Sequence, residues 1–171
     1  NSVEANDDYC GYHYADGGGA WGAHLENCLV AFNTADATLE PCGVSLARGG
    51  GTMNCTNVNS TIVGNTCVSW DVSSGGGCQG SLVLNSIIVS NSPGDLFEGS
   101  VMYSCSPGLD AGNGNISVDP LLANVSGEDF HLTSGSPCID AGSNQAWMVG
   151  AVDLDENPRI VNGVVDMGAY E

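Results

Sequence analysis

Basic residues are almost absent from this sequence of 171 residues. Lys and Arg together number 2, against 20 Asp and Glu, which gives a formal net charge of −18. Because nucleic acids and anionic lipid surfaces are held mainly by Lys and Arg, we expect neither as a partner. Such an acidic excess suits a soluble extracellular protein or one that binds divalent cations. General solubility is the simpler explanation for any single acidic residue.

Long apolar runs, a start Met and a basic leader are also missing. No run is long enough to cross a bilayer, so direct membrane insertion is not expected. We therefore expect a mature or excised piece of a secreted or cell-surface protein. Charged residues make up only 13% of the chain and Gly occupies 25 positions, so good helix formers are few and turns must be numerous. An all-β fold is favoured.

Common catalytic and nucleotide-binding signatures are absent as well. The sequence has no G-x-S-x-G, H-E-x-x-H or P-loop motif, which removes the usual indications of those enzyme classes. Residues 17–22 formally match G-x-G-x-x-G, but they begin one of three similar Gly runs. A turn explains them better than a nucleotide site.

The eight cysteines form no Cys-x-x-Cys motif and no zinc-type spacing with histidine. An even number in a Lys-poor chain instead predicts disulfides, an oxidising compartment and the oxidation of most cysteines. Spacing does not determine their connectivity. The alternative is a set of buried free thiols, since free Cys packs like a small hydrophobic residue. The cysteines are Cys10, Cys28, Cys42, Cys55, Cys67, Cys78, Cys105 and Cys138.

One short phrase occurs three times, at residues 27–34, 59–66 and 85–92. Each copy has Asn, then Cys or Ser, a short apolar centre, and a second Asn six positions after the first. The copies are offset by 32 and then by 26 positions. A triple-Gly run precedes each copy by eight to ten positions. Repeats at this spacing are typical of a solenoid.

In a parallel β-solenoid, coils stack about 4.8 Å apart and equivalent residues form ladders. Asn at a turn can adopt the left-handed conformation, and its amide can bond to the amide of the next coil. An antiparallel sandwich, the alternative, would not predict the fixed order of Gly run and Asn phrase. The uneven offsets predict that the variable segments 34–48 and 67–74 bulge as loops.

We expect a single β-helix domain over residues 1–171. Repeat coils should occupy about 1–105, and a terminal coil and cap about 106–171, because a solenoid needs an atypical end to cover its last apolar layer. The opposite end carries Tyr9, Tyr12, Tyr14 and Trp21.

Aromatic residues are enriched where protein surfaces meet, and an open strand edge promotes further pairing. We therefore expect self-association from end to end, as a fibre or a tandem array, because a start-to-tail contact does not close on itself. The alternative is that residues 1–16 fold back as their own cap, fixed by Cys10.

The C-terminal part of the sequence contains five motifs: Ser-Val-Asp-Pro-Leu-Leu at 117–122, Asp-Phe-His-Leu at 129–132, Gly-Ser-Pro-Cys-Ile-Asp-Ala-Gly at 135–142, Asp-Leu-Asp-Glu-Asn-Pro-Arg at 153–159 and Val-Asp-Met-Gly-Ala-Tyr-Glu at 165–171. These motifs resemble the end of bacterial right-handed parallel β-helix surface proteins, which have polymorphic outer-membrane-protein-like repeats and a choice-of-anchor type C-terminal segment. The resemblance implies a right-handed parallel β-helix displayed outside the cell. Glu156 departs from the family, which commonly has Gly there.

Asp153, Asp155 and Asn157 are the strongest metal-site candidates. They place oxygen-bearing side chains on alternating positions of one loop, where they could converge on a hard cation such as calcium. The loop is not an EF-hand, because Pro158 and Val164 occupy positions that need Gly and Glu. The alternative is a turn whose Asp and Asn side chains cap backbone amides. A weaker variant of the same idea comprises Asp110, Asn113 and Asn115.

β-Helices also host enzymes that cleave polysaccharides. A lyase needs a cationic side chain beside the uronate, and only Arg48 and Arg159 are available. A glycosidase needs two carboxylates roughly 5–10 Å apart, and spacing singles out no pair. The candidate carboxylates are Asp71, Asp95, Asp110 and Asp140, while His13, His24 and His131 share no local motif with a nucleophile.

We therefore expect a non-catalytic extracellular structural or adhesive module. Its partners would be copies of itself, or another cell-surface protein or polysaccharide. The alternative function is a carbohydrate-active β-helix, either polysaccharide lyase or glycoside hydrolase, or a sugar-binding module.

Overall fold

The computed structural model describes residues 2–4, 12–38, 43–110 and 112–171 of the chain. Its regular elements are short β-strands and two single-turn 3-10 helices, η1 (Val125–Gly127) and η2 (Ala146–Met148). No helix in these ranges is long and apolar enough to cross a membrane. The fold is all-β, as the composition predicts.

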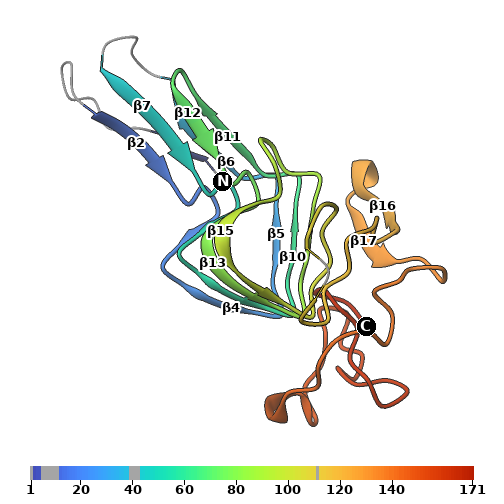
Figure 1. Ribbon diagram of the computed structural model, residues 1–171. Coiled ribbons are helices and arrows are strands. Elements are labelled where there is room, and N and C mark those ends of the chain that lie inside the picture. The colour runs from blue at the N-terminus through green and yellow to red at the C-terminus, as the bar shows by residue number, and fades with distance from the viewer. Residues whose placement is uncertain (1, 5–11, 39–42, 111) are drawn as a thin grey trace.

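Two parallel sheets form the body of the molecule. A curved sheet has the order β3-β8-β13-β9-β4, with β15 paired to β13, and it curls into a half-barrel (Figure 1). A flat sheet has the order β14-β10-β5. The strands of the curved sheet are β3 (Ala20–Trp21), β4 (His24–Glu26), β8 (Thr52–Met53), β9 (Thr56–Val58), β13 (Cys78–Leu84) and β15 (Leu96–Met102). Those of the flat sheet are β5 (Leu29–Ala31), β10 (Thr61–Val63) and β14 (Ile87–Val89).

Two further parallel sheets form an arm that projects from the body at the upper left of Figure 1. One sheet has the order β12-β7-β2 and the other β1-β6-β11. A small core of Ala and Cys side chains lies in the arm: Ala15, Ala35, Ala37, Ala47 and Cys67. The arm strands are β1 (Ser2–Glu4), β2 (Tyr12–Asp16), β6 (Thr34–Ala37), β7 (Val44–Arg48), β11 (Thr66–Ser69) and β12 (Val72–Ser74).

The expectation that segments 34–48 and 67–74 are loops was wrong. Most of these residues belong to β6, β7 and β12 of the arm, which pair in parallel with their counterparts in neighbouring repeats. Small side chains alternate with larger ones in β6 and β7, and burial alternates with them. This period of two residues is the pattern of a strand with one buried face.

Strand pairing follows the two offsets between the Asn phrases. Thr61 of β10 lies opposite Leu29 of β5, its equivalent in the phrase before, and opposite Ile87 of β14, its equivalent in the phrase after. The curved sheet repeats both offsets, since Thr56 pairs with His24 and with Leu82. The predicted parallel ladders between repeats are thus confirmed. We call residues 12–37 the first layer, 44–69 the second, 72–92 the third and 96–105 the fourth.

The two Asn residues of each phrase have different roles. The first one turns the chain between the curved and flat sheets, with positive φ of 57° at Asn27, 44° at Asn59 and 50° at Asn85. Asn tolerates this left-handed conformation better than most residues. The second one builds a buried amide ladder. Nδ2 of Asn33 donates to Oδ1 of Asn65 at 2.9 Å, and Nδ2 of Asn65 donates to Oδ1 of Asn91 at 2.9 Å.

The Gly runs lie at the waist between arm and body. Gly49 has a φ of +60°, which Gly adopts without steric cost. At Gly50, an added Cβ would lie 2.5 Å from the Thr66 carbonyl oxygen and 2.6 Å from the Gly76 carbonyl oxygen. The chain entering the body therefore passes directly against both the chain leaving it and the next layer. Only Gly fits this crossing.

The body core lies between the curved and flat sheets. Ile62 and Ile88 of the flat sheet and Val83 of the curved sheet are fully buried there. Burying a side chain of this size contributes about 1.5–3 kcal/mol relative to leaving it exposed. Leu96 and Val101 of β15 extend the same core into the fourth layer.

The tail lies beside the stack as well as beyond its last layer. It contains the antiparallel pair β16 (Leu122–Asn124) and β17 (Asp129–Leu132). The tail bonds all three turn asparagines: Asn27 donates to the Val152 carbonyl, Asn59 to that of Asp166 and Asn85 to that of Ser143.

The tail covers the outer face of the flat sheet, and Ile116 pairs with Cys105 at the end of the fourth layer; the terminal coil and cap over about 106–171 stay a prediction. All three residues of β10 are buried. Ile87 and Met167 are both buried in a second core between the flat sheet and the tail.

Candidate functional site

The first layer presents an open strand edge. In the described ranges, β2, β3, β4 and β5 each have a partner strand on one side only, in the second layer. Trp21 of β3 is 66% exposed at this edge. Unpaired backbone groups along an edge can hydrogen-bond to another strand. The edge is therefore a candidate contact surface.

The outer face of the arm adds exposed apolar side chains to this surface. Tyr12 and Tyr14 of β2 stack on each other, with ring centroids 6.0 Å apart. Val44 of β7 lies in register with Tyr12, and Val72 of β12 is two strands from Tyr14; both valines are exposed. Three of the four aromatic residues singled out in the sequence thus lie on the first layer and are exposed. The fourth, Tyr9, lies outside the described residues.

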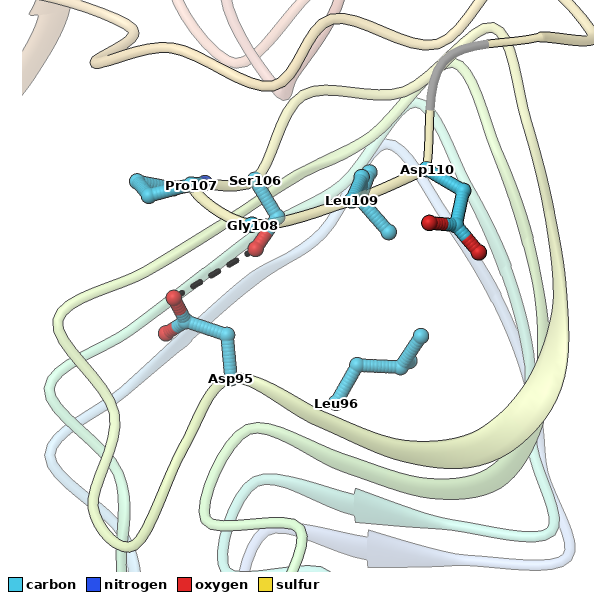
Figure 2. A pocket seen from close by; sticks show the side chains of 7 residues that line it. All are labelled: Asp95, Leu96, Ser106, Pro107, Gly108, Leu109 and Asp110. Carbon is cyan, nitrogen blue, oxygen red and sulfur yellow. Dashed lines mark hydrogen bonds between the residues drawn. The ribbon is translucent and has the colours of Figure 1, made fainter.

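A pocket of about 290 Å³ lies over the fourth layer (Figure 2). Asp95 and Asp110 face it from different sides, and the side chains of Leu96 and Leu109 give it apolar walls. The remaining lining residues are Ser106, Pro107 and Gly108. The structure thus brings together two of the four carboxylates named as candidates.

Both carboxylate oxygens of Asp95 already accept hydrogen bonds from other residues of the fold. Its Oδ1 accepts hydrogen bonds from the backbone N–H and from Nδ2 of Asn91, each at 2.9 Å, and so ends the Asn ladder. Its Oδ2 accepts a bond of 3.3 Å from the Ser106 hydroxyl. The other two candidates lie elsewhere. Asp71 accepts from the Ser45 N–H in the arm, and the backbone N–H of Asp140 donates to Oδ1 of Asp166 in the tail. Asp110, by contrast, is exposed at the pocket.

Both arginines are held inside the fold. Arg48 makes a two-pronged ion pair with Asp16, at 2.9 and 2.7 Å, and lies over the Tyr14 ring. Arg159 is fully buried in the tail, where Nη2 donates to the carbonyls of Asp166 and Gly168. Desolvation lowers the pKa of Arg159. Since the sequence has no other Lys or Arg, the pocket has no nearby cationic side chain to neutralise a uronate.

The three metal-site candidates stay close in sequence but differ in their contacts. Asp153 is buried, and its Oδ1 accepts the backbone N–H groups of Asp155 and Asn157 at 2.9 and 2.8 Å. Asp155 instead bonds to His131. In the described ranges, no group of three or more His, Cys, Asp or Glu has a metal-binding arrangement. Asp153 thus caps backbone amides, which is the alternative weighed for this motif, and calcium binding stays a prediction.

His131 lies between two carboxylates. Its Nδ1 is 2.6 Å from Oδ1 of Asp129, and its Nε2 is 2.7 Å from Oδ2 of Asp155. Its ring also lies against Tyr170, with centroids 4.3 Å apart. The hydrogen bond with Asp129 raises the pKa of His131 above its usual 6.5 and lowers the pKa of Asp129 below its usual 3.8. We call these residues the His131 cluster; it joins β17 to the 153–157 turn.

Sequence spacing indicates the Asp129–His131 contact of this cluster but not the contact with Asp155. Asp129 and His131 are two positions apart on one strand, so they share a face. Nothing in the spacing indicates that Asp155 would meet them.

The His131 cluster predicts a pH dependence of stability. The pKa of His131 is raised in the folded state. The stability that His131 contributes is therefore complete below its unfolded-state pKa of about 6.5, and it is lost as the pH rises through the folded-state pKa. The pKa of Asp129 is lowered in the folded state. The stability that this carboxylate contributes is therefore lost as the pH falls through that lowered pKa. The unfolding midpoint of wild type relative to His131→Gln should therefore decrease between about pH 6 and pH 9.

Thermal unfolding across this range measures the difference. His24→Gln is the matched control, because His24 is exposed and lies 3.7 Å from a single carboxylate, Glu26. A difference for His131→Gln that does not change with pH would contradict the prediction.

The six described cysteines are free thiols, which contradicts the expectation that most cysteines are oxidised. The ladders give a physical reason, because each of four cysteines lies opposite a small residue in one neighbouring layer. The Ser60 hydroxyl and the Cys55 thiol both accept backbone N–H bonds from the layer before. The register partners are Ser60 for Cys28, Ser81 for Cys55, Ala35 for Cys67 and Thr52 for Cys78. Cys10 and Cys42 lie outside the described residues.

Three features of the described chain thus offer contacts or chemistry. The first-layer edge carries exposed aromatic side chains, the pocket carries two carboxylates, and the His131 cluster holds one histidine between two carboxylates. No protein-family model matches this chain, and neither a curated protein nor a solved structure matches it.

Proposed function

We propose that the chain is a non-catalytic structural or adhesive module of an extracellular protein, built as a right-handed parallel β-helix. The parallel, in-register layers support the β-helix architecture. The resemblance of the tail motifs to bacterial surface proteins supports the handedness and the extracellular location. The net charge of −18 fits such a setting.

The open first-layer edge is the observation that carries the proposed role. Its strands have unpaired backbone groups on one side in the described ranges, and Tyr12, Tyr14 and Trp21 are exposed on the same layer. Unpaired edges and exposed aromatic side chains both favour contact with another surface. The tail covers a different face, the outer side of the flat sheet. A second copy that docks on the first-layer edge through its opposite, C-terminal end would leave its own first-layer edge open, so the assembly would grow in one direction.

Trp21→Lys should weaken self-association at least about tenfold, because Trp anchors at interface centres commonly contribute about 2 kcal/mol or more. Sedimentation velocity over a concentration series measures the effect. Wild type should show sedimentation coefficients that rise with concentration, with and without calcium.

Trp70→Lys is the matched control for that experiment. Trp70 is 67% exposed, about as much as Trp21, but it directly follows the second layer, and its Nε1 donates to the Thr38 carbonyl at 2.9 Å. Both variants change the charge equally. A strictly monomeric wild type, or equal effects of the two substitutions, would exclude the edge as the association site.

The pocket over the fourth layer favours a second candidate, a sugar-binding module. Two carboxylates and two leucine side chains offer hydrogen-bond acceptors and an apolar surface, the mixture that small-ligand sites commonly have. Calorimetric titration with neutral oligosaccharides tests this function, with Asp110→Asn as the variant that should lose binding. Release of reducing ends from polysaccharides by wild type, abolished in the same variant, would instead establish a glycosidase.

A further inference from the structure

Cys105 and Cys138 differ from the other described cysteines in their surroundings. Cys105 lies in register with Ile87 of the third layer and with Ile116, so large apolar side chains lie on both sides of it. Cys138 comes from the tail. Both thiols are fully buried, and they belong to one core cluster together with Ile87 and Met167.

The two thiols lie at the junction of stack and tail. The Cys105 thiol donates to the Val118 carbonyl at 3.3 Å, and the interaction between the two cysteine side chains raises the pKa of Cys105 and lowers that of Cys138. The backbone on both sides is fixed. The Cys105 N–H donates to the Ser86 carbonyl at 2.9 Å, and the Cys138 carbonyl accepts from the Met167 N–H at 3.0 Å.

We propose that Cys105 and Cys138 are a disulfide-forming pair that covalently joins the fourth layer to the tail. The two side chains belong to one packed cluster of four buried residues, and a disulfide joins such neighbours where their Cα atoms lie within about 7 Å. The bond would close a loop that runs from position 105 to position 138 of the chain. It would fasten the tail over the second core.

The oxidant is a low-molecular-weight disulfide such as glutathione disulfide. Both thiols are fully buried in the folded chain, so the exchange takes place during folding, when the Cys138 thiolate can reach the oxidant. The Cys138 sulfur bonds to one glutathione sulfur, the glutathione S–S bond breaks, and one glutathione thiolate leaves. Cys105 then loses its proton and attacks the Cys138 sulfur, which releases the second glutathione. The protein loses two electrons and two protons, and the oxidant becomes two glutathione thiols.

Refolding in a glutathione redox buffer, followed by non-reducing digestion and mass spectrometry, tests the pair. Among the six described cysteines, the Cys105–Cys138 peptide should be the dominant disulfide. The oxidised protein should unfold at a temperature about 10 °C higher than the reduced protein, since a loop of this size is strongly constrained by a cross-link.

Cys138→Ala should abolish the cross-linked peptide and the shift. Cys55→Ser is the control that should keep both, because Ser already stands at the equivalent position 81. Peptide mapping of wild type decides the question even where a variant folds poorly. Folded wild type in which Cys105 and Cys138 stay reduced, or pair with other cysteines, would overturn the proposal.

Discussion

Gly50→Ala should destabilise the protein by about 4 kcal/mol or more, a very large effect for one added methyl group. The added Cβ would lie 2.5 Å from the Thr66 carbonyl oxygen and 2.6 Å from that of Gly76. Both contacts are with backbone, which cannot rotate away as a flexible side chain can. Relief would require separating the layers at the waist, where the Gly50 N–H also bonds to the Gly75 carbonyl. Typical domains are stable by only about 5–15 kcal/mol, so much of the fold would be lost at moderate temperature.

Chemical denaturation monitored by circular dichroism measures this change. Gly135→Ala is the matched control, because its nearest neighbour would be Leu121 Cδ1 at 4.0 Å and its φ is not in the left-handed region. That substitution should change stability by less than about 1 kcal/mol, since it mainly restricts the unfolded chain. Similar stabilities of the two variants would show that the waist is not closely packed.

Asn65→Asp should cost about 3–5 kcal/mol, because it removes the central donor of the amide ladder. Asn65 is fully buried, and its Nδ2 donates to Oδ1 of Asn91 and to the carbonyls of Val30 and Val63. The introduced carboxylate would face these three acceptors with no proton to share. The change alters almost no volume, so the loss would report hydrogen bonding and charge rather than a cavity.

Asn113→Asp provides the matched control for that substitution. Asn113 is exposed and has a φ of 51°, a conformation that Asp also tolerates. The unfolding free energy of this variant should stay within about 0.5 kcal/mol of wild type. Equal costs at positions 65 and 113 would contradict the buried ladder.

The repeat could be predicted from sequence because each layer needs the same two kinds of residue at its corners. Gly49 and Asn59 supply left-handed conformations, and Asn65 supplies the buried amide, so the pattern survives in the sequence at the pairing offsets. The arm could not be predicted this way. Its core consists of Ala and Cys, whose small side chains give a weak hydrophobic signal although they allow close packing of the two sheets.

The features of the candidate site were harder to predict, because they combine distant segments. The pocket joins Asp95 to Asp110 across a turn, and the His131 cluster joins β17 to Asp155. The sequence spacing of these residues indicates neither the pocket nor the contact between His131 and Asp155. The cysteines were mispredicted because their even number suggested disulfides. Four of them instead occupy ladder positions opposite small residues of a neighbouring layer.

The parallel, in-register stacking of four successive layers is the central claim, since it creates the open edge, the waist and the ladders. Nitroxide amino acids at two exposed positions of the curved sheet test it most directly by electron paramagnetic resonance. His24 and Leu82 are two layers apart, so their backbones should lie about 10 Å apart, and Ser100 one layer farther, at about 14 Å from His24. A His24–Leu82 separation above about 20 Å, or a shorter distance to Ser100 than to Leu82, would contradict the stacked architecture.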